Sequence, residues 1–196
     1  MERLRKLLHG KTAGNIAVLI LALIGAYFFL YREMRFFRIP STSMEPTLHP
    51  VDQIVTLAEG TYHRGDIVVL RETDGSGDYF VKRIVGIPGD KITIMGGVLN
   101  INGSYASEPY IAEPINYEIR EPVEVPAGSV FVLGDNRNNS SDSHDALESF
   151  STDIIVGRVR YIYYPYGRMG GVPSYPLTSV GDEKARVATV AAPGVQ

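Results

Sequence analysis

An uncharged apolar stretch near the N-terminus is the feature that most restricts how this chain can fold. Residues 13–31 contain no charged side chain, and as a helix they measure roughly 28 Å, close to the hydrocarbon core of a bilayer. A cleaved secretory signal also begins with basic residues and an apolar run, but this run continues through residues 27–31 instead of becoming small and polar. We therefore expect a transmembrane helix at 13–31 that is not removed.

The charges that flank this segment bear on its orientation. Arg3, Arg5, Lys6 and Lys11 precede it, and three arginines follow it within residues 32–38. Cytoplasmic flanks tend to carry the larger number of basic residues. We expect a short basic cytoplasmic N-terminus at 1–12, a single membrane pass, and the rest of the chain on the outer face of the cell membrane.

Beyond residue 40 the apolar residues follow the spacing of β-strands. Two runs on either side of Gly96–Gly97, residues 91–95 and 98–102, predict a hairpin with a two-residue turn. The other predicted strands are β-branched or aromatic runs bounded by glycine, proline or aspartate, at residues 54–57, 66–70, 79–85, 129–133 and 154–164. The expected fold class is mainly β, with an antiparallel β-domain at 40–177.

Two segments flank this predicted domain. Residues 32–39 join it to the apolar segment, and we expect them to be a juxtamembrane linker. Residues 178–196 are rich in Ala, Val and Gly without a periodic pattern, so we expect a disordered tail.

Composition excludes several kinds of function. The chain has no cysteine, which rules out a thiolate nucleophile, a disulfide and a zinc site with cysteine ligands. Its formal net charge of −3 gives no excess of basic residues, so we expect no nucleic acid partner. The four histidines are not spaced as metal ligands, and we expect no metal and no cofactor.

Ser43 is a candidate nucleophile in a segment stiffened by Pro40 and Pro46. A serine hydroxyl reacts at neutral pH only when a base takes its proton and donors stabilise the oxyanion that forms. The hydroxyl of Ser41, two residues earlier, and the N–H of Ser43 could serve as those donors. The alternative interpretation is that serine, threonine and proline simply form a turn here.

Lys82 is the candidate base. In an extended run over residues 79–85 it shares a face with Phe80 and Ile84, and burial on that face would disfavour the charged ammonium. The alternative is a surface lysine whose aliphatic stem packs on the domain. Arg83 shares the opposite, equally apolar face, so alternation does not choose between the two faces.

A polar loop at 134–144 follows the predicted strand 129–133. Its Asn, Asp and Ser side chains can hold backbone in place and present oxygens to an ammonium, which would position Lys82. A competing arrangement is a Ser43–His144–Asp142 triad. A separation of two residues in a loop is a poor geometry for an aspartate to orient a histidine, and the triad leaves Lys82 without a role.

Four segments together resemble the type I signal peptidases, membrane-bound serine proteases that remove signal peptides from exported proteins. They occur in the family's order, at residues 40–48, 64–69, 79–92 and 134–143. The resemblance implies an antiparallel β-domain of the signal-peptidase type anchored by one N-terminal transmembrane helix. It also implies preproteins with signal peptides as substrates, the lipid bilayer as a partner, and transient contact with the export machinery.

The resemblance also implies roles for the site residues. Ser43 is the nucleophile, Lys82 the general base, and Ser41 with the Ser43 N–H forms the oxyanion hole. Ser140 is expected to orient Lys82. Substrates are expected to carry small side chains one and three residues before the cleaved bond.

The last of the four segments contains three further site residues. By resemblance, Asp142, Asp135 and Arg137 hold the site together and help to orient the lysine. The family often has arginine after Asp-Ser, where this chain has His144, so we expect an arginine–aspartate pair to be missing or replaced by a pH-dependent contact. Arg137 or Arg83 could compensate.

Two other classes of protein share part of this pattern. Self-cleaving regulators of the SOS repressor type also use serine and lysine on a β-domain, but the apolar N-terminal segment argues against them. A non-catalytic, membrane-tethered β-domain that binds peptides would need neither Ser43 nor a buried Lys82. We therefore favour a signal-peptide-cleaving serine endopeptidase.

Overall fold

The computed structural model describes residues 14–27, 34–73, 75–173, 175–177 and 190–191. The chain divides into two compact units, Met1–Arg35 and Phe36–Gln196. In the first unit, residues 14–27 form an α-helix. Among the described residues, no helix is both long and apolar enough to cross a membrane. Residue 13, residues 28–31 and the predicted cytoplasmic segment 1–12 lie outside the described residues.

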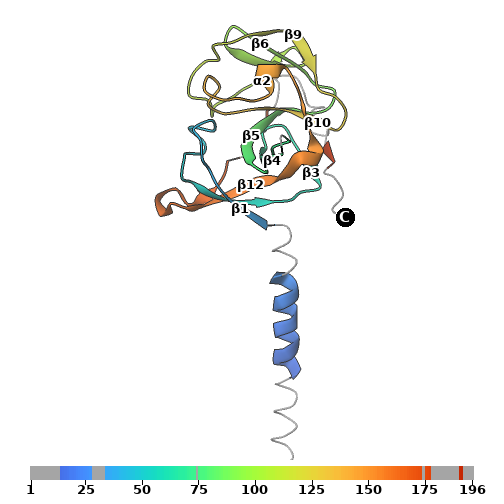
Figure 1. Cartoon of the computed structure of the whole chain (residues 1–196), viewed down its shortest axis with the longest axis vertical. Helices are drawn as coiled ribbons and strands as arrows, with labels where there is room; N and C mark the ends of the chain where they lie inside the picture. The colour runs from blue at the N-terminus through green and yellow to red at the C-terminus, as the bar shows by residue number, and fades with distance from the viewer. Residues whose placement is uncertain (1–13, 28–33, 74, 174, 178–189, 192–196) are drawn as a thin grey trace, which may run out of the picture. The chain divides into compact units, whose positions relative to one another are not determined.

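In the rest of the described chain, the regular secondary structure is almost entirely strand (Figure 1). Its strands are β1 (Met34–Arg38), β2 (Gln53–Leu57), β3 (Thr61–Tyr62), β4 (Ile67–Arg71), β5 (Tyr79–Gly86), β6 (Lys91–Met95), β7 (Val98–Ile101), β8 (Ser104–Tyr105), β9 (Ile119–Glu124), β10 (Ser129–Leu133), β11 (Phe150–Ser151), β12 (Ile155–Tyr164), β13 (Gly170–Gly171) and β14 (Val190–Ala191). Its short helices are α2 (Ser143–Ala146), η1 (Thr152–Ile154) and η2 (Tyr166–Arg168). The prediction of a mainly β fold is confirmed.

Most strands belong to one large sheet. Its order is β1-β2-β12-β4-β5-β10-β11, with β13 paired to β12, and the pairings of β2, β4, β5, β10, β11, β12 and β13 are antiparallel. A smaller sheet has the order β8-β7-β6-β9 and lies at the opposite end of the domain from β12 (Figure 1). In it β6 pairs with β7 from Met95 opposite Val98 onward, which confirms the predicted hairpin. The predicted antiparallel arrangement is therefore confirmed.

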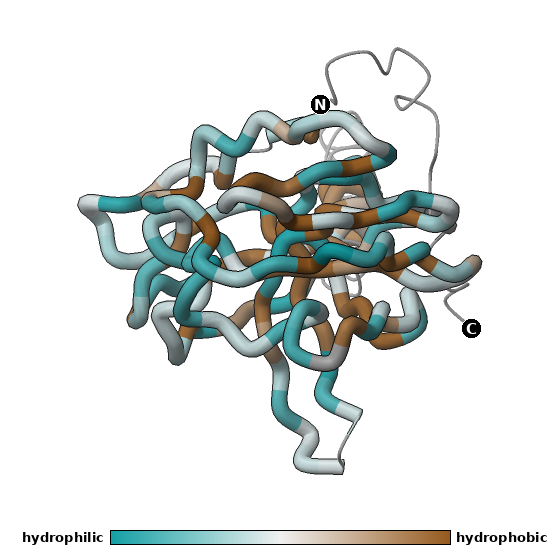
Figure 2. Tube along the Cα trace, turned by 90° about the horizontal axis from the view of Figure 1, so that it is seen from above, coloured by the Kyte–Doolittle hydropathy of each residue, from teal (hydrophilic) through white to brown (hydrophobic). Residues whose placement is uncertain are grey.

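Apolar side chains on both faces of β5 build the interior. Phe80 and Ile84 pack into one buried cluster with residues of β4 and β10, whereas Val81 and Val85 pack into two other clusters. Figure 2 shows the apolar residues concentrated along the strands and the polar ones in the loops at the periphery. Because both faces are covered, residues 82–86 of β5 are buried whichever face they occupy.

The segments that flank the predicted domain contain two further strands. Most of the predicted linker 32–39 is strand β1, which pairs next to β2 at the edge of the large sheet, so the linker prediction is wrong for Met34–Arg38. Arg35, Phe37 and Ile39 are two residues apart, as on one face of a strand. The charge of Arg35 on that face hides the apolar alternation in the sequence. Of the predicted tail, the structure describes Val190–Ala191, which form strand β14 against β3.

Candidate active site

A polar pocket brings together the predicted catalytic residues. It is lined by Ser41, Thr42 and Ser43 from the segment before β2, by Lys82 from β5, and by Ser140 and Asp145 from the polar loop and α2. These residues come from three parts of the sequence up to about a hundred positions apart. Tertiary folding therefore brings Ser43, Lys82 and Ser140 to one pocket.

Lys82 is buried in this pocket, with an exposed fraction of 4%. On β5 it pairs with Val68 of β4, and its neighbours on the same face, Phe80 and Ile84, belong to one apolar cluster. Its Nζ donates a hydrogen bond to Ser140 Oγ at 2.9 Å. Burial lowers the pKa of Lys82 below its ordinary value, although the nearby carboxylates of Asp142 and Asp145 act in the opposite direction. A larger share of Lys82 is therefore neutral than for a lysine on the surface.

Ser140 is oriented by Asp142. The Ser140 hydroxyl donates to Asp142 Oδ2 at 2.6 Å, and the Gly134 N–H donates to the same oxygen at 2.8 Å. Since its proton points to Asp142, Ser140 Oγ presents a lone pair to Lys82. The structure thus agrees with the predicted contact between Ser140 and the lysine, and it places Asp142 directly behind Ser140.

The polar loop also holds the backbone of the Ser43 segment. The Asn136 N–H donates to the carbonyl of Ser43 at 3.0 Å, and the Asn136 side chain donates to the carbonyl of Thr42 at 3.2 Å. Asn139 donates to the Thr42 hydroxyl, also at 3.2 Å. These three bonds fix the nucleophile segment to the loop that carries Ser140.

The Ser43 hydroxyl lies 3.2 Å from the hydroxyl of Ser41, and either can be the donor. In the described part of the chain, no hydrogen bond joins Ser43 to Lys82, whose Nζ donates to Ser140 instead. A catalytic hydrogen bond is often long or misaligned before substrate binds.

Gly134 is a site residue that the sequence did not indicate beyond its position after a strand. A Cβ atom on Gly134 would collide with the side chain of Ser140 and with the carbonyl oxygen of Ser43. Glycine therefore allows the nucleophile segment and the lysine-binding serine to approach each other. Only the folded arrangement shows this requirement, because the three residues are brought together by tertiary contacts.

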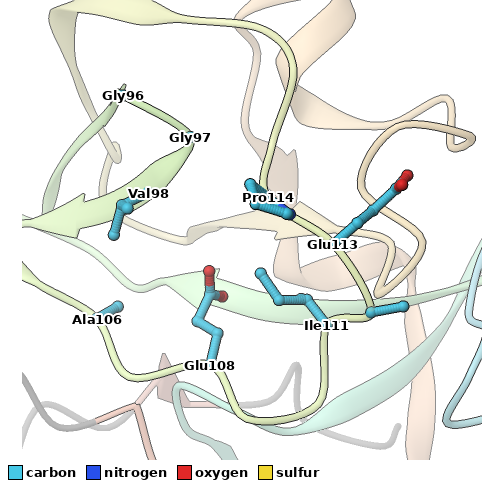
Figure 3. Close-up of a pocket in the computed structure, with 9 residues that line it drawn as sticks. Gly96, Gly97, Val98, Ala106, Glu108, Ile111, Glu113 and Pro114 are labelled. Carbon is cyan, nitrogen blue, oxygen red and sulfur yellow. The ribbon is translucent and has the colours of Figure 1, made fainter.

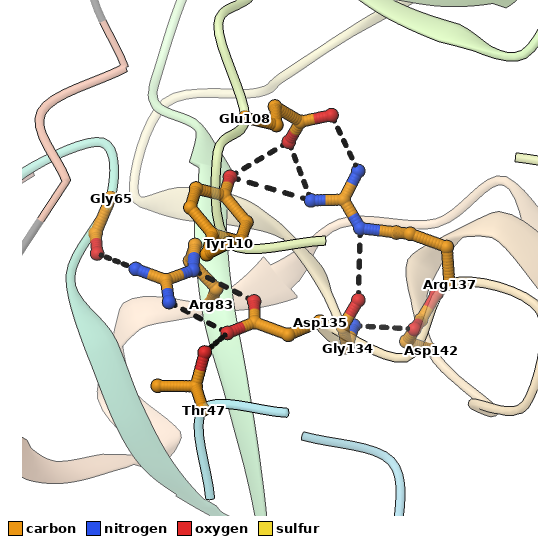
Figure 4. Close-up of polar contacts among 9 residues, drawn as sticks. All are labelled: Thr47, Gly65, Arg83, Glu108, Tyr110, Gly134, Asp135, Arg137 and Asp142. Carbon is orange, nitrogen blue, oxygen red and sulfur yellow. Dashed lines mark hydrogen bonds and ion pairs between the residues drawn. The ribbon is translucent and has the colours of Figure 1, made fainter. Parts of the chain in front are cut away.

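Arg83 belongs to a buried ionic network, shown in Figure 4. As the next residue on β5, it faces the opposite way from Lys82. Arg83, with no exposed surface, forms two hydrogen bonds to Asp135 at 2.6 and 2.8 Å, and its guanidinium lies 3.9 Å from the centre of the Tyr110 ring. Thr47, four residues after Ser43, donates to Asp135 Oδ2 at 2.5 Å. Asp135 thus links strand β5 to the segment that carries Ser43, and none of its hydrogen bonds goes to Lys82.

Arg137 completes the network. It donates to both carboxylate oxygens of Glu108, at 2.6 and 2.9 Å, and to the carbonyl of Gly134 at 2.9 Å (Figure 4). Glu108 lies on the chain between β8 and β9, where nothing in the sequence pointed to a partner for Arg137. The same carboxylate also lines a second, mostly apolar pocket beside the Gly96–Gly97 turn (Figure 3).

His144 lies against Asp142. Its Nδ1 is 2.5 Å from Asp142 Oδ1 and its Nε2 is 3.2 Å from Asp145 Oδ1. The expectation that a two-residue separation is a poor geometry for this contact is wrong, because Asp142 is the N-cap of α2 and its carboxylate turns back over the first turn. The suggested compensation is also wrong, since Arg83 pairs with Asp135 and Arg137 with Glu108.

The described residues contain no group of three or more His, Asp or Glu side chains placed to bind a metal ion. The chemistry that the pocket can support on its own residues is acid–base and nucleophilic. A buried lysine beside a serine hydroxyl is an arrangement that can transfer an acyl group.

Comparison with known proteins places the chain in a family. Residues 12–164 match the family described as signal peptidase, peptidase S26. The chain is 38% identical over 170 residues to signal peptidase I U of Bacillus subtilis, covering 79% of this chain and 90% of the relative. It is 33% identical over 167 residues to signal peptidase I of Bacillus licheniformis, covering 79% and 87%.

A crystal structure of a signal peptidase I from Enterococcus faecalis also matches, with 28% identity and a TM-score of 0.44 over 50% of this chain and 95% of that one. The fold, the pocket and the family match define a peptidase, a hydrolase of peptide bonds. More specifically, the chain belongs to the signal peptidase family, peptidase S26.

Proposed function

We propose that this chain is a membrane-bound serine endopeptidase that removes signal peptides from exported preproteins by means of Ser43 and Lys82. The observation that carries the proposal is the position of Lys82, which is buried, has a lowered pKa and lines one pocket with Ser43. The family match supports the substrate class.

The proposed reaction is an acyl transfer. Neutral Lys82 takes the proton of Ser43 as the serine oxygen attacks the scissile carbonyl, and the tetrahedral oxyanion is bound by the Ser41 hydroxyl and the Ser43 N–H. In the described part of the chain that N–H forms no hydrogen bond, which leaves it free to donate. Protonated Lys82 then donates to the leaving amine, and water repeats the sequence on the ester.

Ser140 and Asp142 support the base in this proposal. The hydrogen bond from Lys82 to Ser140 fixes the direction of Nζ, and Asp142 fixes the direction of the Ser140 hydroxyl. The negative charge of Asp142 also favours protonated Lys82, which opposes the effect of burial. Asp135 and Arg137 act at a distance from the reaction, because they brace the loop and the strand that carry these residues.

The membrane part of the proposal depends on the sequence. Residues 13–31 would anchor the enzyme with its N-terminus in the cytoplasm and the β-domain outside the cell membrane. Enzyme and membrane-embedded signal peptide would then share one surface, which raises their effective concentration. The preferred substrates would have small side chains one and three residues before the cut, and contact with the export machinery would be transient.

Cleavage of a preprotein tests the proposal directly. The full chain, purified in detergent, is mixed with a preprotein that has small residues before its cleavage site, and the products are located by mass spectrometry. We expect one cut by the wild type, none by Ser43→Ala or Lys82→Ala, and an unchanged rate with Lys91→Ala, a matched exposed lysine. Undiminished cleavage by Ser43→Ala would exclude Ser43 as the nucleophile.

The close Asp142–His144 contact is the one observation that favours a Ser43–His144–Asp142 triad instead. In such a triad the free ring nitrogen of the histidine must face the serine, but Nε2 of His144 faces Asp145. If Lys82→Ala retained near-full activity and His144→Ala did not, the histidine would be the base and the lysine assignment would be wrong.

A further inference from the structure

His144 is held between two carboxylates, one at each ring nitrogen. Nδ1 is 2.5 Å from Asp142 and Nε2 is 3.2 Å from Asp145, while the ring stacks on Tyr117 with centroids 4.0 Å apart and is 15% exposed. A neutral imidazole has an N–H on only one nitrogen, so a neutral His144 would place a lone pair against one carboxylate. An imidazolium donates at both positions. The geometry therefore fits the protonated ring.

The groups that surround the ring support a positive charge. The hydrogen bond from Ser141 lowers the pKa of Asp145, and His144 lowers it as well, so Asp145 is ionised. Burial raises the pKa of the Tyr117 phenol, and Asp142 raises it further, so the stacked ring is neutral. These two residues and Asp142 are the partners that contact the His144 ring.

Charged groups slightly farther away complete the surroundings. Lys82 on β5 interacts with the same two carboxylates, which both raise its pKa against the effect of burial. Behind Tyr117, Arg137 and Glu108 both act on the phenol but pair with each other. Lys82 and His144 therefore share the negative charge of Asp142 and Asp145.

A chain of direct contacts connects His144 to the base. Asp142 uses one carboxylate oxygen for His144 and the other for the Ser140 hydroxyl and the Gly134 N–H. Ser140 in turn accepts from Lys82. If the His144 ring bond is lost, Asp142 still accepts from Ser140, Gly134 and the His144 N–H, but its Oδ1 loses the one side-chain donor. The carboxylate, and with it the Ser140 hydroxyl, is then held less firmly beside the lysine.

We propose that protonated His144 is a positioning residue for the general base, which it holds in place through Asp142 and Ser140, and that loss of its proton weakens this support. This inference deepens the proposed function, because it assigns to the same site a control by the protonation of His144. Two effects act in one direction when the proton leaves. Asp142 is less firmly held, and its uncompensated charge favours protonated, inactive Lys82.

Two substitutions imitate the two states of the ring. Arginine at position 144 keeps a positive charge at every pH, and glutamine keeps a side chain of similar length without the charge. We would measure kcat/KM on a soluble peptide with small residues before the cut, from pH 5.5 to 9.5, for the wild type, His144→Arg and His144→Gln. Titration of Lys82 affects all three, so the ratio between them isolates the contribution of residue 144.

The expected result is a crossover. At the acid end the wild type follows the arginine variant and exceeds the glutamine variant by roughly tenfold, because a misplaced base costs at least that much. At the alkaline end it follows the glutamine variant. The inference is overturned if the wild type follows one variant over the whole range, or if both substitutions reduce kcat/KM equally at every pH.

A measurement without substrate covers the case in which neither variant folds. In the wild type labelled with 15N at histidine, the ring nitrogens of His144 should report an imidazolium at the acid end and should lose one proton within the same pH range as the crossover. Asp142→Asn should move that titration to lower pH. A His144 ring that stays neutral over the whole range would exclude the inference.

His63 provides the matched control. It lies 3.6 Å from Asp66 and is about half exposed, away from the Lys82 pocket, so His63→Gln should leave the pH profile unchanged. The two proposals also fail separately. If Ser43→Ala and Lys82→Ala still cleave, the proposed function is wrong; if they are inactive and the position-144 variants show no crossover, only the role of His144 is wrong.

Discussion

Lys82 and Arg83 are neighbours on β5 and are both buried, but their charges are neutralised to different extents. Arg83 has a carboxylate at 2.6 Å, a backbone carbonyl at 2.7 Å and an aromatic ring over its guanidinium. Lys82 has one neutral hydroxyl at 2.9 Å and no salt bridge among the described residues. The arginine is fully paired, whereas the lysine carries an incompletely compensated charge.

The difference follows from the chemistry of the two side chains. A guanidinium stays protonated at any pH relevant to the protein, so burying it requires a complete set of acceptors. An ammonium can lose its proton when it is buried, and a site that needs a base benefits from this loss. One strand thus carries a structural cation on one face and a titratable one on the other.

Lys82→Met should produce the largest change, a loss of activity without a loss of folding. Without the base, kcat/KM is expected to fall roughly a thousandfold, while the protein stays folded because Met fits the apolar surroundings of the lysine stem. Peptide cleavage and circular dichroism measured together would show this. Lys91→Met, at an exposed position of β6, is the matched control and should retain full activity.

Arg83→Met should produce the opposite result, a loss of stability. It leaves the carboxylate of Asp135 buried without its cation, which is expected to cost about 3–5 kcal/mol in the free energy of unfolding. Arg120→Met breaks an ion pair with Glu118 that has the same 2.6 Å distance but is exposed, and should cost less than about 1 kcal/mol. Similar losses in urea denaturation for both variants would contradict the comparison.

Gly134→Ala tests how closely the two sides of the pocket must approach. The added Cβ meets the Ser43 carbonyl and the Ser140 side chain, so we expect a loss of roughly 1–3 kcal/mol in stability and of about a hundredfold in kcat/KM. Gly167→Ala, where nothing lies within 4 Å of the added atom, should change neither quantity. Full activity in Gly134→Ala would mean that the pocket adjusts without cost.

The smallest expected effect is a change with pH in the difference in Tm between Lys82→Met and the wild type. Because burial lowers the pKa of Lys82, the unfolded chain binds more protons than the folded protein between that lowered value and the ordinary value of 10.5. The stability contribution of Lys82 therefore increases as pH rises through this window. We expect Lys82→Met to have a higher Tm than the wild type at pH 7 and a smaller advantage near pH 10. If the difference in Tm did not change with pH, a lowered pKa of Lys82 in the folded protein would be excluded.

Local sequence predicted much of the framework. The hairpin around Gly96–Gly97 and the strand Ser129–Leu133 match their predicted residues, since their turns and apolar alternation are local properties. Strand β9 was missed because its pattern, Ile-Arg-Glu-Pro-Val-Glu, is mostly polar and includes a proline; it forms only because β6 offers it a free edge.

Which residues could react, and that a β-domain would carry them, could be predicted from sequence alone, because a serine between prolines and a lysine in an apolar strand are local features. What surrounds each of them depends on tertiary contacts. The face of β5 that Lys82 occupies, the closeness of Gly134 to Ser43, and the pairing of Arg137 with Glu108 all join residues far apart in the chain. Such contacts depend on strand register and on packing between sheets, and alternation along one strand leaves them open.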